Sequence, residues 1–460
     1  MGDFKNLVET VNPATEQKLD SYPCMNDAAV TEAIEACHDA HREWRKRSFS
    51  ERAGVLCSIA GTLQQHKEPL ARLMTDEMGK LLSQSFDEVD LCAAICEYAA
   101  EQAPEVLASQ RRSLITGGTA RVSFQPLGVV YGIQPWNYPA YQVVRYALAS
   151  LAAGNGVLLK HASNVTGTGQ QLQAIFNEAG LPDGLFRALV IGHEQSRAVI
   201  KHPLVRGVTL TGSAAAGREI GKQAGAALKK TVLELGSNDA YLVLEDADID
   251  HAVKHAVQGR IYNNGETCIA AKRFIVTQPV YQCFRDAFVE AMDAVRLGDP
   301  TAEDSELGPM ARSDLREKLH DQVQDSVEAG ASVLCGGALP DRTGFYYPAT
   351  VLEDVGPGQP AYTEELFGPV ASLIVAKDRR DAMRIANDSR FGLGGGIFSA
   401  DEDAAIALAE DHFDTGMVFI NRFGLADPAM PFGGVKDSGY GREHGGFGLR
   451  EFVNVKAVAT

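Results

Sequence analysis

The hydrophobic pattern of the first part of the chain is helical. From Asn26 to Trp44 the apolar residues recur every three or four positions, and Asn26 or Asp27 precedes them as a candidate N-cap. The same spacing continues in the segments that follow. It predicts further helices over roughly 50–66, 69–79 and 84–108.

After residue 127 the pattern changes to short apolar runs that alternate with helical segments. The runs GVVYGI and GVLLK have the composition of buried strands, and LFRALVI, GVTLTG and TVLEL follow them. Strand–helix alternation of this kind predicts a parallel sheet with helices on both faces. The intervening helices are expected near 139–152, over 165–179, from about 194, and over 214–227.

A second α/β pattern begins near residue 240. The glycine-rich stretch PFGGVKDSGYGREHGGFG close to the end is predicted to be a loop. A chain of 460 residues is too long for one ordinary core, so we expect two or three domains of the α/β class. The expected strands here are AYLVL, KRFIVT, FGPVASLIVA and GMVFIN, and the expected helices cover 247–262, 280–295 and 311–329.

Charge and composition limit the partners of the protein. The formal net charge is −17 and the pI is about 5.1, so phosphate-rich surfaces repel the chain, and we expect neither nucleic acid nor membrane as a partner. The segment MGDFKNLVET lacks the apolar core of a secretory signal, and no run approaches the roughly 18 apolar residues of a membrane span. The eight cysteines are scattered, which favours a reducing, cytoplasmic location. Cys92 and Cys96 have no second pair or His cluster near them, so no metal site is expected.

Four short segments carry the candidate chemistry: PWNYP (135–139), LELG (233–236), NNGETC (263–268) and EELFGPV (364–370). In this order and at these distances they resemble the aldehyde dehydrogenase superfamily. The similarity runs from NPAT at 12–15 to the C-terminal FGLREFVNVKAV. That ending, together with KHASN (160–164) and GAALKKTVLELG (225–236), is most similar to the shorter bacterial and cyanobacterial succinate-semialdehyde dehydrogenases.

The resemblance implies a division of the chain into three parts. A Rossmann-like cofactor-binding domain would comprise residues 1–108 and 128–234, and an α/β catalytic domain would comprise 235–439. A small β oligomerisation segment would comprise 109–127 and 440–460. Its pairing across a subunit interface implies a homodimer or a homotetramer.

Cys268 is the candidate nucleophile, because it lies in a polar, glycine-containing loop and a thiolate attacks carbonyl carbons readily. The alternative for any one cysteine is an inert buried thiol. Glu234 closes the strand TVLEL, and the resemblance gives it the role of general base; the alternative is a salt-bridged strand-end residue. The family usually has a second glycine where this chain has Ser237, which affects the backbone freedom of the loop beside the base.

Asn137 is the candidate oxyanion donor. Its side-chain amide would act with the backbone N–H of Cys268. A turn-forming Asn before Pro139 is the alternative. By resemblance, Cys268 attacks the aldehyde, the oxidised adduct is a thioester, and Glu234 activates the water that releases the acid. Relatives that pass the acyl group to coenzyme A lack this Glu.

The chain lacks the GxGxxG fingerprint of the standard dinucleotide site, so the cofactor residues come from the resemblance. Gly212 and Ser213 would meet the pyrophosphate at a helix N-terminus. Glu365 would bind the nicotinamide ribose, with Phe367 beside the nicotinamide and Trp136 in the same site. Surface and core positions are the alternatives for these residue types.

Lys160 and Ser163 bear on the choice between NADP and NAD. Lys160 would bind the adenosine ribose or its 2′-phosphate. NAD-preferring relatives commonly carry a Glu three residues later, and its charge would repel that phosphate. Here the position is Ser163, so we predict a preference for NADP, with NAD also possible. Equal binding of both cofactors is the alternative.

Arg145 is the candidate substrate clamp. It lies eight residues after Asn137, just over two helical turns, among apolar neighbours where an unpaired guanidinium is costly. Succinate-semialdehyde dehydrogenases have an Arg here, so the expected substrate is succinate semialdehyde. The alternative is a structural pairing of Arg145 with a protein carboxylate. Two further residues depart from the pattern of some relatives: Tyr262 stands where they have a second Arg, and Ala426 where others have Ser.

The sequence leaves three other functions open. One is a broad-range aldehyde dehydrogenase that acts on uncharged aldehydes. Another is a cysteine acyl hydrolase or acyltransferase that needs no nicotinamide cofactor. The last is a catalytically inactive binding protein on the same fold.

Overall fold

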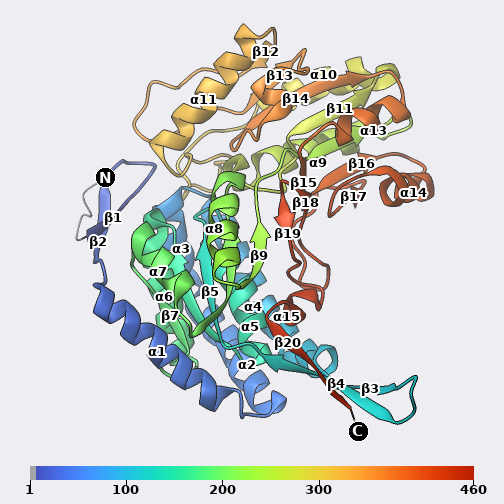
Figure 1. Cartoon of the computed structure of the whole chain (residues 1–460). Coiled ribbons are helices and arrows are strands. Elements are labelled where there is room, and N and C mark those ends of the chain that lie inside the picture. Colours follow the sequence, from blue (N-terminus) through green and yellow to red (C-terminus); the bar gives the residue numbers. More distant parts are fainter. Residues whose placement is uncertain (1–6, 460) are drawn as a thin grey trace.

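The computed structural model describes residues 7–459, which form two α/β lobes and a projecting three-stranded arm (Figure 1). The N-terminal hairpin, β1 (Leu7–Val11) and β2 (Lys18–Pro23), lies at the edge of the first lobe. The sequence pattern did not predict this hairpin. No helix in the described range is both long and apolar enough to cross a membrane.

The first lobe is built on a sheet with the strand order β19-β9-β8-β5-β6-β7. Its strands are parallel except for β19, which pairs antiparallel with β9. The central strands are buried on both faces, as their continuous apolar runs predict. The strands are β5 (Val129–Gln134), β6 (Gly156–His161), β7 (Phe186–Ala188), β8 (Val205–Thr211), β9 (Lys230–Glu234) and β19 (Gly439–Tyr440).

Helices cover both faces of this sheet, and each face has its own apolar core. One core contains α1 (Asp27–Trp44), α7 (His193–Lys201) and α8 (Ala214–Ala226). The other core contains α2 (Phe49–Gln65), α3 (Lys67–Met78), α4 (Leu82–Val106), α5 (Tyr141–Ala153) and α6 (Thr166–Glu178). The expected N-cap of the first helix is confirmed, because the Asn26 side chain accepts from the N–H of Ala29.

The second lobe has a sheet with the order β12-β13-β14-β11-β10-β16-β17. Only the edge strand β12 is antiparallel to its neighbour. The strands are β10 (Ala240–Val243), β11 (Arg273–Thr277), β12 (Ser332–Cys335), β13 (Thr350–Glu353), β14 (Val370–Ala376), β16 (Gly395–Phe398) and β17 (Phe419–Ile420). One face packs on α9 (Ile249–Ile261) and α10 (Gln278–Asp293), and the other on α11 (Ser313–Glu328), α12 (Pro360–Thr363), α13 (Arg379–Asn387) and α14 (Glu402–His412).

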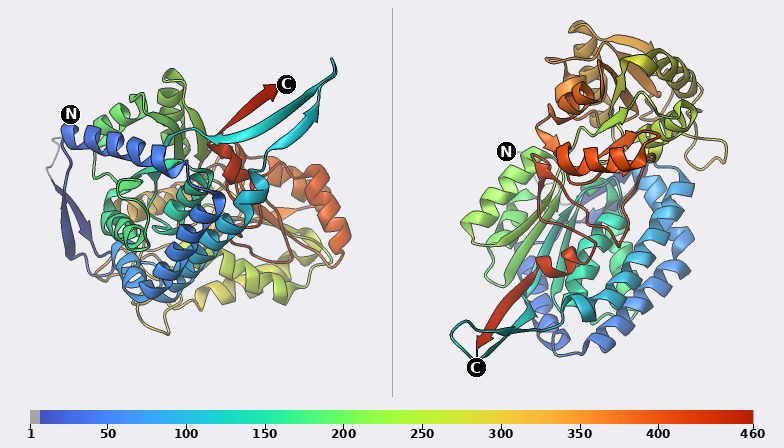
Figure 2. Two further views of the ribbon diagram at one scale, coloured as in Figure 1. Left: turned by 90° about the horizontal axis from the view of Figure 1, so that it is seen from below. Right: turned by 90° about the vertical axis from the view of Figure 1, so that its right-hand side faces the viewer.

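The arm consists of β3 (Gln110–Ser113), β4 (Thr119–Pro126) and the C-terminal β20 (Val453–Ala459). Figure 2 shows that it extends away from both lobes. Strand β4 pairs antiparallel with β20 along its length. Val455 and Val458 of β20 are exposed. Leu449 and Phe452, which precede β20, are instead buried in the core of the first lobe.

The sequence expectations fail where elements are short. The glycine-rich tail is not only loop, because it contains β18 (Val435–Lys436), β19 and the start of α15 (Phe447–Glu451). Strand β18 pairs with β15 (Phe391–Gly392), and β19 pairs with β9, so long-range partners supply an order that no local pattern shows. The run LFRALVI forms only three residues of strand. The strands β12, β13 and β16 and the helices α13 and α14 are too short for their period to stand out.

Candidate active site

Cys268 lies in the loop that joins the 3-10 turn Tyr262–Gly265 to β11. Asn263 and Asn264 have φ angles of 55° and 58°, a left-handed conformation that Asn tolerates better than other L-residues. Their side chains fix the turn, since Asn264 Nδ2 donates to the carbonyls of Gly79 (2.9 Å) and Pro309 (2.8 Å). The polar residues of NNGETC therefore hold a buried loop in a shape that presents the thiol.

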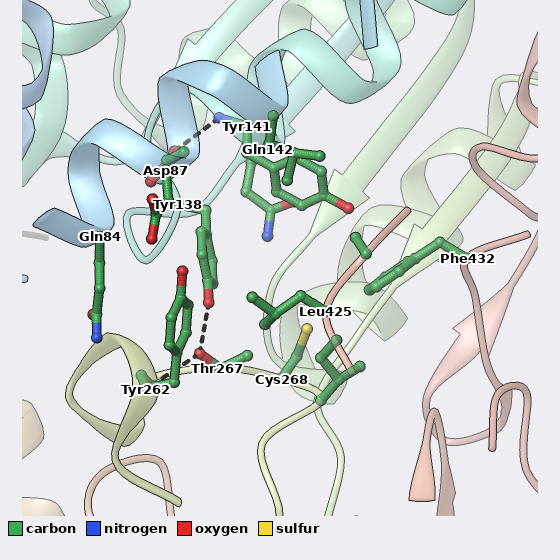
Figure 3. Close-up of a pocket in the computed structure, with 14 residues that line it drawn as sticks. Gln84, Asp87, Tyr138, Tyr141, Gln142, Tyr262, Thr267, Cys268, Leu425 and Phe432 are labelled. Carbon is green, nitrogen blue, oxygen red and sulfur yellow. Dashed lines mark hydrogen bonds between the residues drawn. The ribbon is translucent and has the colours of Figure 1, made fainter. Parts of the chain in front are cut away.

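The thiol of Cys268 points into a cavity between the two lobes (Figure 3). Tyr262 and Ala426, the two departures noted in the sequence, both line this cavity. Its walls are mainly aromatic and apolar, with a few polar side chains from α4 and α5. The other lining residues are Gln84, Asp87, Glu88, Leu91, Tyr138, Tyr141, Gln142, Thr267, Ile269, Leu425 and Phe432.

Burial controls the ionisation of the nucleophile. It raises the pKa of the Cys268 thiol to about 12, while the positive charges of Lys272 and Arg145 act in the opposite direction. In this arrangement the thiol is neutral near pH 7. Attack on a carbonyl therefore requires a change around Cys268 that favours its thiolate form.

Asn137 lies beside the nucleophile loop, in the turn between β5 and α5. Its Nδ2 donates to the backbone carbonyl of Glu266 at 3.0 Å, and Asn263 Nδ2 donates to the Asn137 carbonyl at 2.9 Å. An amide nitrogen carries two hydrogens, so one N–H of Asn137 remains for an oxyanion. The turn is held by Glu88, whose carboxylate accepts from the N–H groups of Ala140 and Tyr141, each at 2.8 Å.

Glu234 ends β9 as expected and is 1% exposed. Among the residues that the structure describes, neither of its carboxylate oxygens has a hydrogen-bond partner. Burial raises its pKa well above the usual range, the charge of Glu443 adds to this, and Arg145 opposes it. Glu234 is not among the described residues that line the Cys268 cavity.

Ser237 stands in the loop after Glu234 where the family usually has glycine. It does not have a positive φ angle, so this position does not need the left-handed backbone that favours glycine. Its N–H donates to Glu365 Oε1 at 2.9 Å, and its hydroxyl hydrogen-bonds to Asp239. The backbone of this position therefore ties the loop to Glu365, and the serine hydroxyl ties it to Asp239.

Arg145 has a protein partner, contrary to the premise of the sequence argument. Arg145 is 2% exposed, and its guanidinium forms an ion pair with the Glu443 carboxylate. It also donates to Thr211 Oγ1 at 3.0 Å. Arg145 lies behind Tyr141 and Phe432, which line the cavity, and its guanidinium is 4.7 Å from the centre of the Phe432 ring. The structure thus supplies the carboxylate that the sequence argument assigned to the substrate.

Gln142 is a cavity residue that the sequence reasoning missed. It is 1% exposed, its Oε1 has no hydrogen-bond partner among the described residues, and Figure 3 shows its amide nitrogen directed into the cavity. Tyr138, Tyr141, Gln142 and Arg145 follow the spacing of one helix face, so this spacing is the signal that could have identified it.

The predicted cofactor residues form three groups in the structure. Lys160 and Ser163 line one cavity at the end of β6, with Thr166 and Ile191. Burial lowers the pKa of Lys160, and no carboxylate among the described residues pairs with its ammonium. An unpaired, partly buried cation beside a serine hydroxyl fits the 2′-phosphate of NADP.

The second group lies at the N-terminus of α8. Ser213 is the N-cap, and its hydroxyl accepts from the N–H of Ala216 at 3.2 Å, while Gly212 precedes it at the end of β8. The third group contains Trp136 and Phe367, whose rings meet edge-to-face with centroids 5.7 Å apart. Glu365 is two residues before Phe367. The contact of Trp136 with Phe367 therefore brings together residues from the two lobes that the sequence assigned to one cofactor.

Comparison with known proteins identifies the family. The model of the aldehyde dehydrogenase family matches residues 2–458 of this chain. The chain belongs to the aldehyde dehydrogenase family. The expected fold is confirmed by the structure of succinic semialdehyde dehydrogenase from Streptococcus pyogenes in complex with NADP+, which is 36% identical, superposes with a TM-score of 0.96, and is matched over 98% of this chain and 99% of that one.

Two curated relatives of this aldehyde dehydrogenase are similar over nearly the whole chain. The succinate semialdehyde dehydrogenase [NAD(P)+] Sad of Escherichia coli is 43% identical, over 98% of this chain and 97% of its own. The succinate-semialdehyde dehydrogenase [NADP(+)] of Deinococcus radiodurans is also 43% identical, over 98% of this chain and 94% of its own. The resemblance stated from the sequence motifs is thereby confirmed.

Proposed function

We propose that this aldehyde dehydrogenase oxidises an aldehyde to a carboxylic acid with NADP, through a thioester on Cys268. The observation that carries the proposal is the position of the Cys268 thiol. It points into a cavity, and Asn137 is hydrogen-bonded to the loop that carries it, while Lys160 and Ser163 lie in a separate cavity of the first lobe. The substrate-level proposal is succinate semialdehyde, the compound in the names of the similar enzymes.

The side chains divide the chemistry as follows. The Cys268 thiolate attacks the carbonyl carbon, and the oxygen that becomes negative accepts hydrogen bonds from Asn137 Nδ2 and the Cys268 backbone N–H. When bound, the nicotinamide cofactor would act as the oxidant that accepts hydride from the substrate carbon. Glu234 then accepts a proton from the water that hydrolyses the thioester, and the acid leaves. A buried carboxyl with a raised pKa and free oxygens is suited to that proton transfer.

NADP fits the residues present. We assign Lys160 and Ser163 to its 2′-phosphate end and the start of α8, at Gly212 and Ser213, to its pyrophosphate. Glu365 would hold the nicotinamide ribose, with Trp136 and Phe367 alongside. These assignments rest on the shared cavity of Lys160 and Ser163, the helix cap at Ser213 and the edge-to-face pair of Trp136 and Phe367.

Recognition of the far end of the substrate involves Gln142 in this proposal. It is a cavity-lining amide with an unpartnered oxygen among the described residues, and its N–H₂ group can donate to a carboxylate or a carbonyl. Arg145 contributes its charge from behind the cavity wall, because it is one of the groups that oppose the rise in the Cys268 pKa. Its direct contact with the substrate would require it to leave Glu443.

One observation favours uncharged aldehydes as a second candidate class. The described residues that line the cavity include no Lys or Arg, but they include the carboxylates of Asp87 and Glu88. The Glu88 charge is matched by buried Lys80. A neutral amide and tyrosine hydroxyls bind a carboxylate less selectively than a guanidinium does, so a wider aldehyde range is compatible with this cavity.

We also propose that residues 1–108 with 128–234 form the cofactor-binding domain, that 235–439 form the catalytic domain, and that the arm mediates a homodimer or homotetramer. The exposed Val455 and Val458 on the outer strand of the arm support its role as an interface. Sedimentation of the purified enzyme measures the oligomeric state directly, and a monomer would contradict this part of the proposal.

The deciding experiment incubates the enzyme with a panel of aldehydes and with NADP or NAD, and follows the absorbance of the reduced cofactor. We expect NADPH to form with succinate semialdehyde. Hydrolysis of acyl esters without any reduced cofactor would instead support a cysteine hydrolase. No turnover with any aldehyde would support a binding protein.

A further inference from the structure

Lys272 is a buried ammonium group between the nucleophile loop and the carboxylate of Glu365. It comes four residues after Cys268, just before β11, and is 1% exposed. Its Nζ donates to the backbone carbonyls of Thr267 at 3.2 Å and Cys268 at 2.5 Å. A buried charge is costly unless it is paired and hydrogen-bonded, so these contacts fix the ammonium beside the nucleophile.

Glu365 is the carboxylate that offsets this charge. Its Oε1 lies 3.4 Å from Lys272 Nζ and also accepts from the N–H of Ser237. The absent side chain of Gly236 leaves the space that the carboxylate fills. The Glu365 side chain is 19% exposed and the Lys272 side chain 1%, so an outside ligand reaches the carboxylate and not the ammonium.

We propose that Lys272 is a positioning residue whose positive charge favours the thiolate of Cys268. The negative charge of Glu365 opposes this effect at the thiol. The inference rests on the proposed role of Cys268 as nucleophile. When the thiol ionises, its proton passes to water and the negative charge on sulfur forms close to the ammonium. A ligand that binds Glu365 reduces the opposing effect of its negative charge, so the positive charge of Lys272 acts more strongly on Cys268. In this way the cofactor-facing carboxylate is linked to the nucleophile.

The charges around Cys268 agree with this arrangement. Burial raises the pKa of its thiol, and Lys272 is the largest of the opposing influences, ahead of Arg145. Glu365 acts in the same direction as burial. Removal of the Lys272 charge should therefore raise the pKa of the Cys268 thiol, and removal of the Glu365 charge should lower it.

The test measures the alkylation rate of each cysteine by iodoacetamide in the full-length enzyme without cofactor, at a pH well below the thiol pKa. Mass spectrometry of the peptides separates Cys268 from the other seven cysteines. The variants are Lys272→Gln, Lys272→Arg, Glu365→Gln and the double variant of Lys272→Gln with Glu365→Gln. Exposed Cys57 and Cys283 serve as internal controls, and fully buried Cys37, Cys92 and Cys96 report unfolding.

We expect Lys272→Gln to slow alkylation of Cys268 about 3- to 10-fold, because the loss in thiolate fraction exceeds the gain in nucleophilicity of a more basic thiol. Glu365→Gln should accelerate it by a similar factor, since it removes the negative charge that opposes the positive charge of Lys272 at the thiol. Lys272→Arg should restore most of the wild-type rate. The double variant should lie near the wild type, with Cys57 and Cys283 unchanged throughout.

An unchanged Cys268 rate in Lys272→Gln would overturn the proposal. So would equal slowing in Lys272→Gln and Lys272→Arg, because that result indicates a shift of the loop and not a loss of charge. Slowing by Glu365→Gln would also contradict it. These rates do not depend on turnover, whereas full oxidation activity in Cys268→Ala would refute the proposed function itself, so the two failures are distinguishable.

Discussion

Arg145 of α5 and Glu443 of the segment before α15 form an ion pair inside the first lobe. Removal of one partner from a buried pair leaves the other charge uncompensated, which typically costs about 3–5 kcal/mol. We therefore expect Arg145→Ala to lower the free energy of unfolding by about that amount. Urea denaturation measures it, and Glu443→Gln is the matched variant that should show a loss of the same sign.

The same variant decides the role of Arg145 in substrate recognition. Because Glu443 occupies the guanidinium, Arg145→Ala should reduce kcat/KM for succinate semialdehyde and for an uncharged aldehyde of similar length by comparable factors. A loss confined to the charged substrate, with unchanged stability, would show that Arg145 leaves Glu443 to clamp the substrate.

We expect Gln142, and not Arg145, to discriminate between succinate semialdehyde and an uncharged aldehyde. A hydrogen bond to a charged group contributes about 1.5–3 kcal/mol, so Gln142→Leu should lower kcat/KM for succinate semialdehyde at least about 10-fold. The uncharged aldehyde should change much less. Gln142→Glu, of nearly the same shape, should impair the charged substrate further by repulsion. Equal effects on both substrates would remove Gln142 from recognition.

The nucleophile and the base have separable effects. Cys268→Ala should abolish oxidation and leave NADP binding intact, because it removes the covalent step without closing the cofactor site. Glu234→Gln should allow a single-turnover burst of NADPH and slow the steady state, since only hydrolysis of the thioester needs the base. An undiminished steady rate in Glu234→Gln would exclude Glu234 as the base.

The pH dependence of hydrolysis follows from the raised pKa of Glu234. A general base acts only when deprotonated, so a raised pKa moves the increase in its rate to higher pH. We expect the deacylation rate of the wild type to rise with pH through that pKa. Rapid-quench measurements on the acyl-enzyme follow it directly, and the rise should be absent in Glu234→Gln.

The preference for NADP depends on Ser163 and Lys160. Ser163→Glu places a carboxylate in the cavity that Lys160 lines, where it would repel a 2′-phosphate and accept from a 2′-hydroxyl. The ratio of kcat/KM for NADP to that for NAD should fall in this variant. A wild-type enzyme that is more efficient with NAD would contradict the assignment of this cavity.

Local sequence determined much of the fold and of the site. The α1 helix with its Asn26 cap and the alternating strands of the first lobe follow from periods of a few residues, which depend only on neighbouring side chains. Cys268, Glu234 and Asn137 were proposed as site residues because the short motifs around them resemble those of a known family, and their roles stay predictions. Trp136 and Phe367 were assigned by resemblance, and the edge-to-face contact of their rings agrees with that assignment.

Only the tertiary structure decided which charges meet. Arg145 has an apolar sequence context that suggests a missing partner, yet the partner, Glu443, comes from a distant glycine-rich segment that the pattern assigned to loop. The pairing of β19 with β9 and the contact of Lys272 with Glu365 arise in the same way. Periodicity specifies which face of an element is buried. It does not specify which remote segment covers that face, because this depends on the packing of both lobes at once.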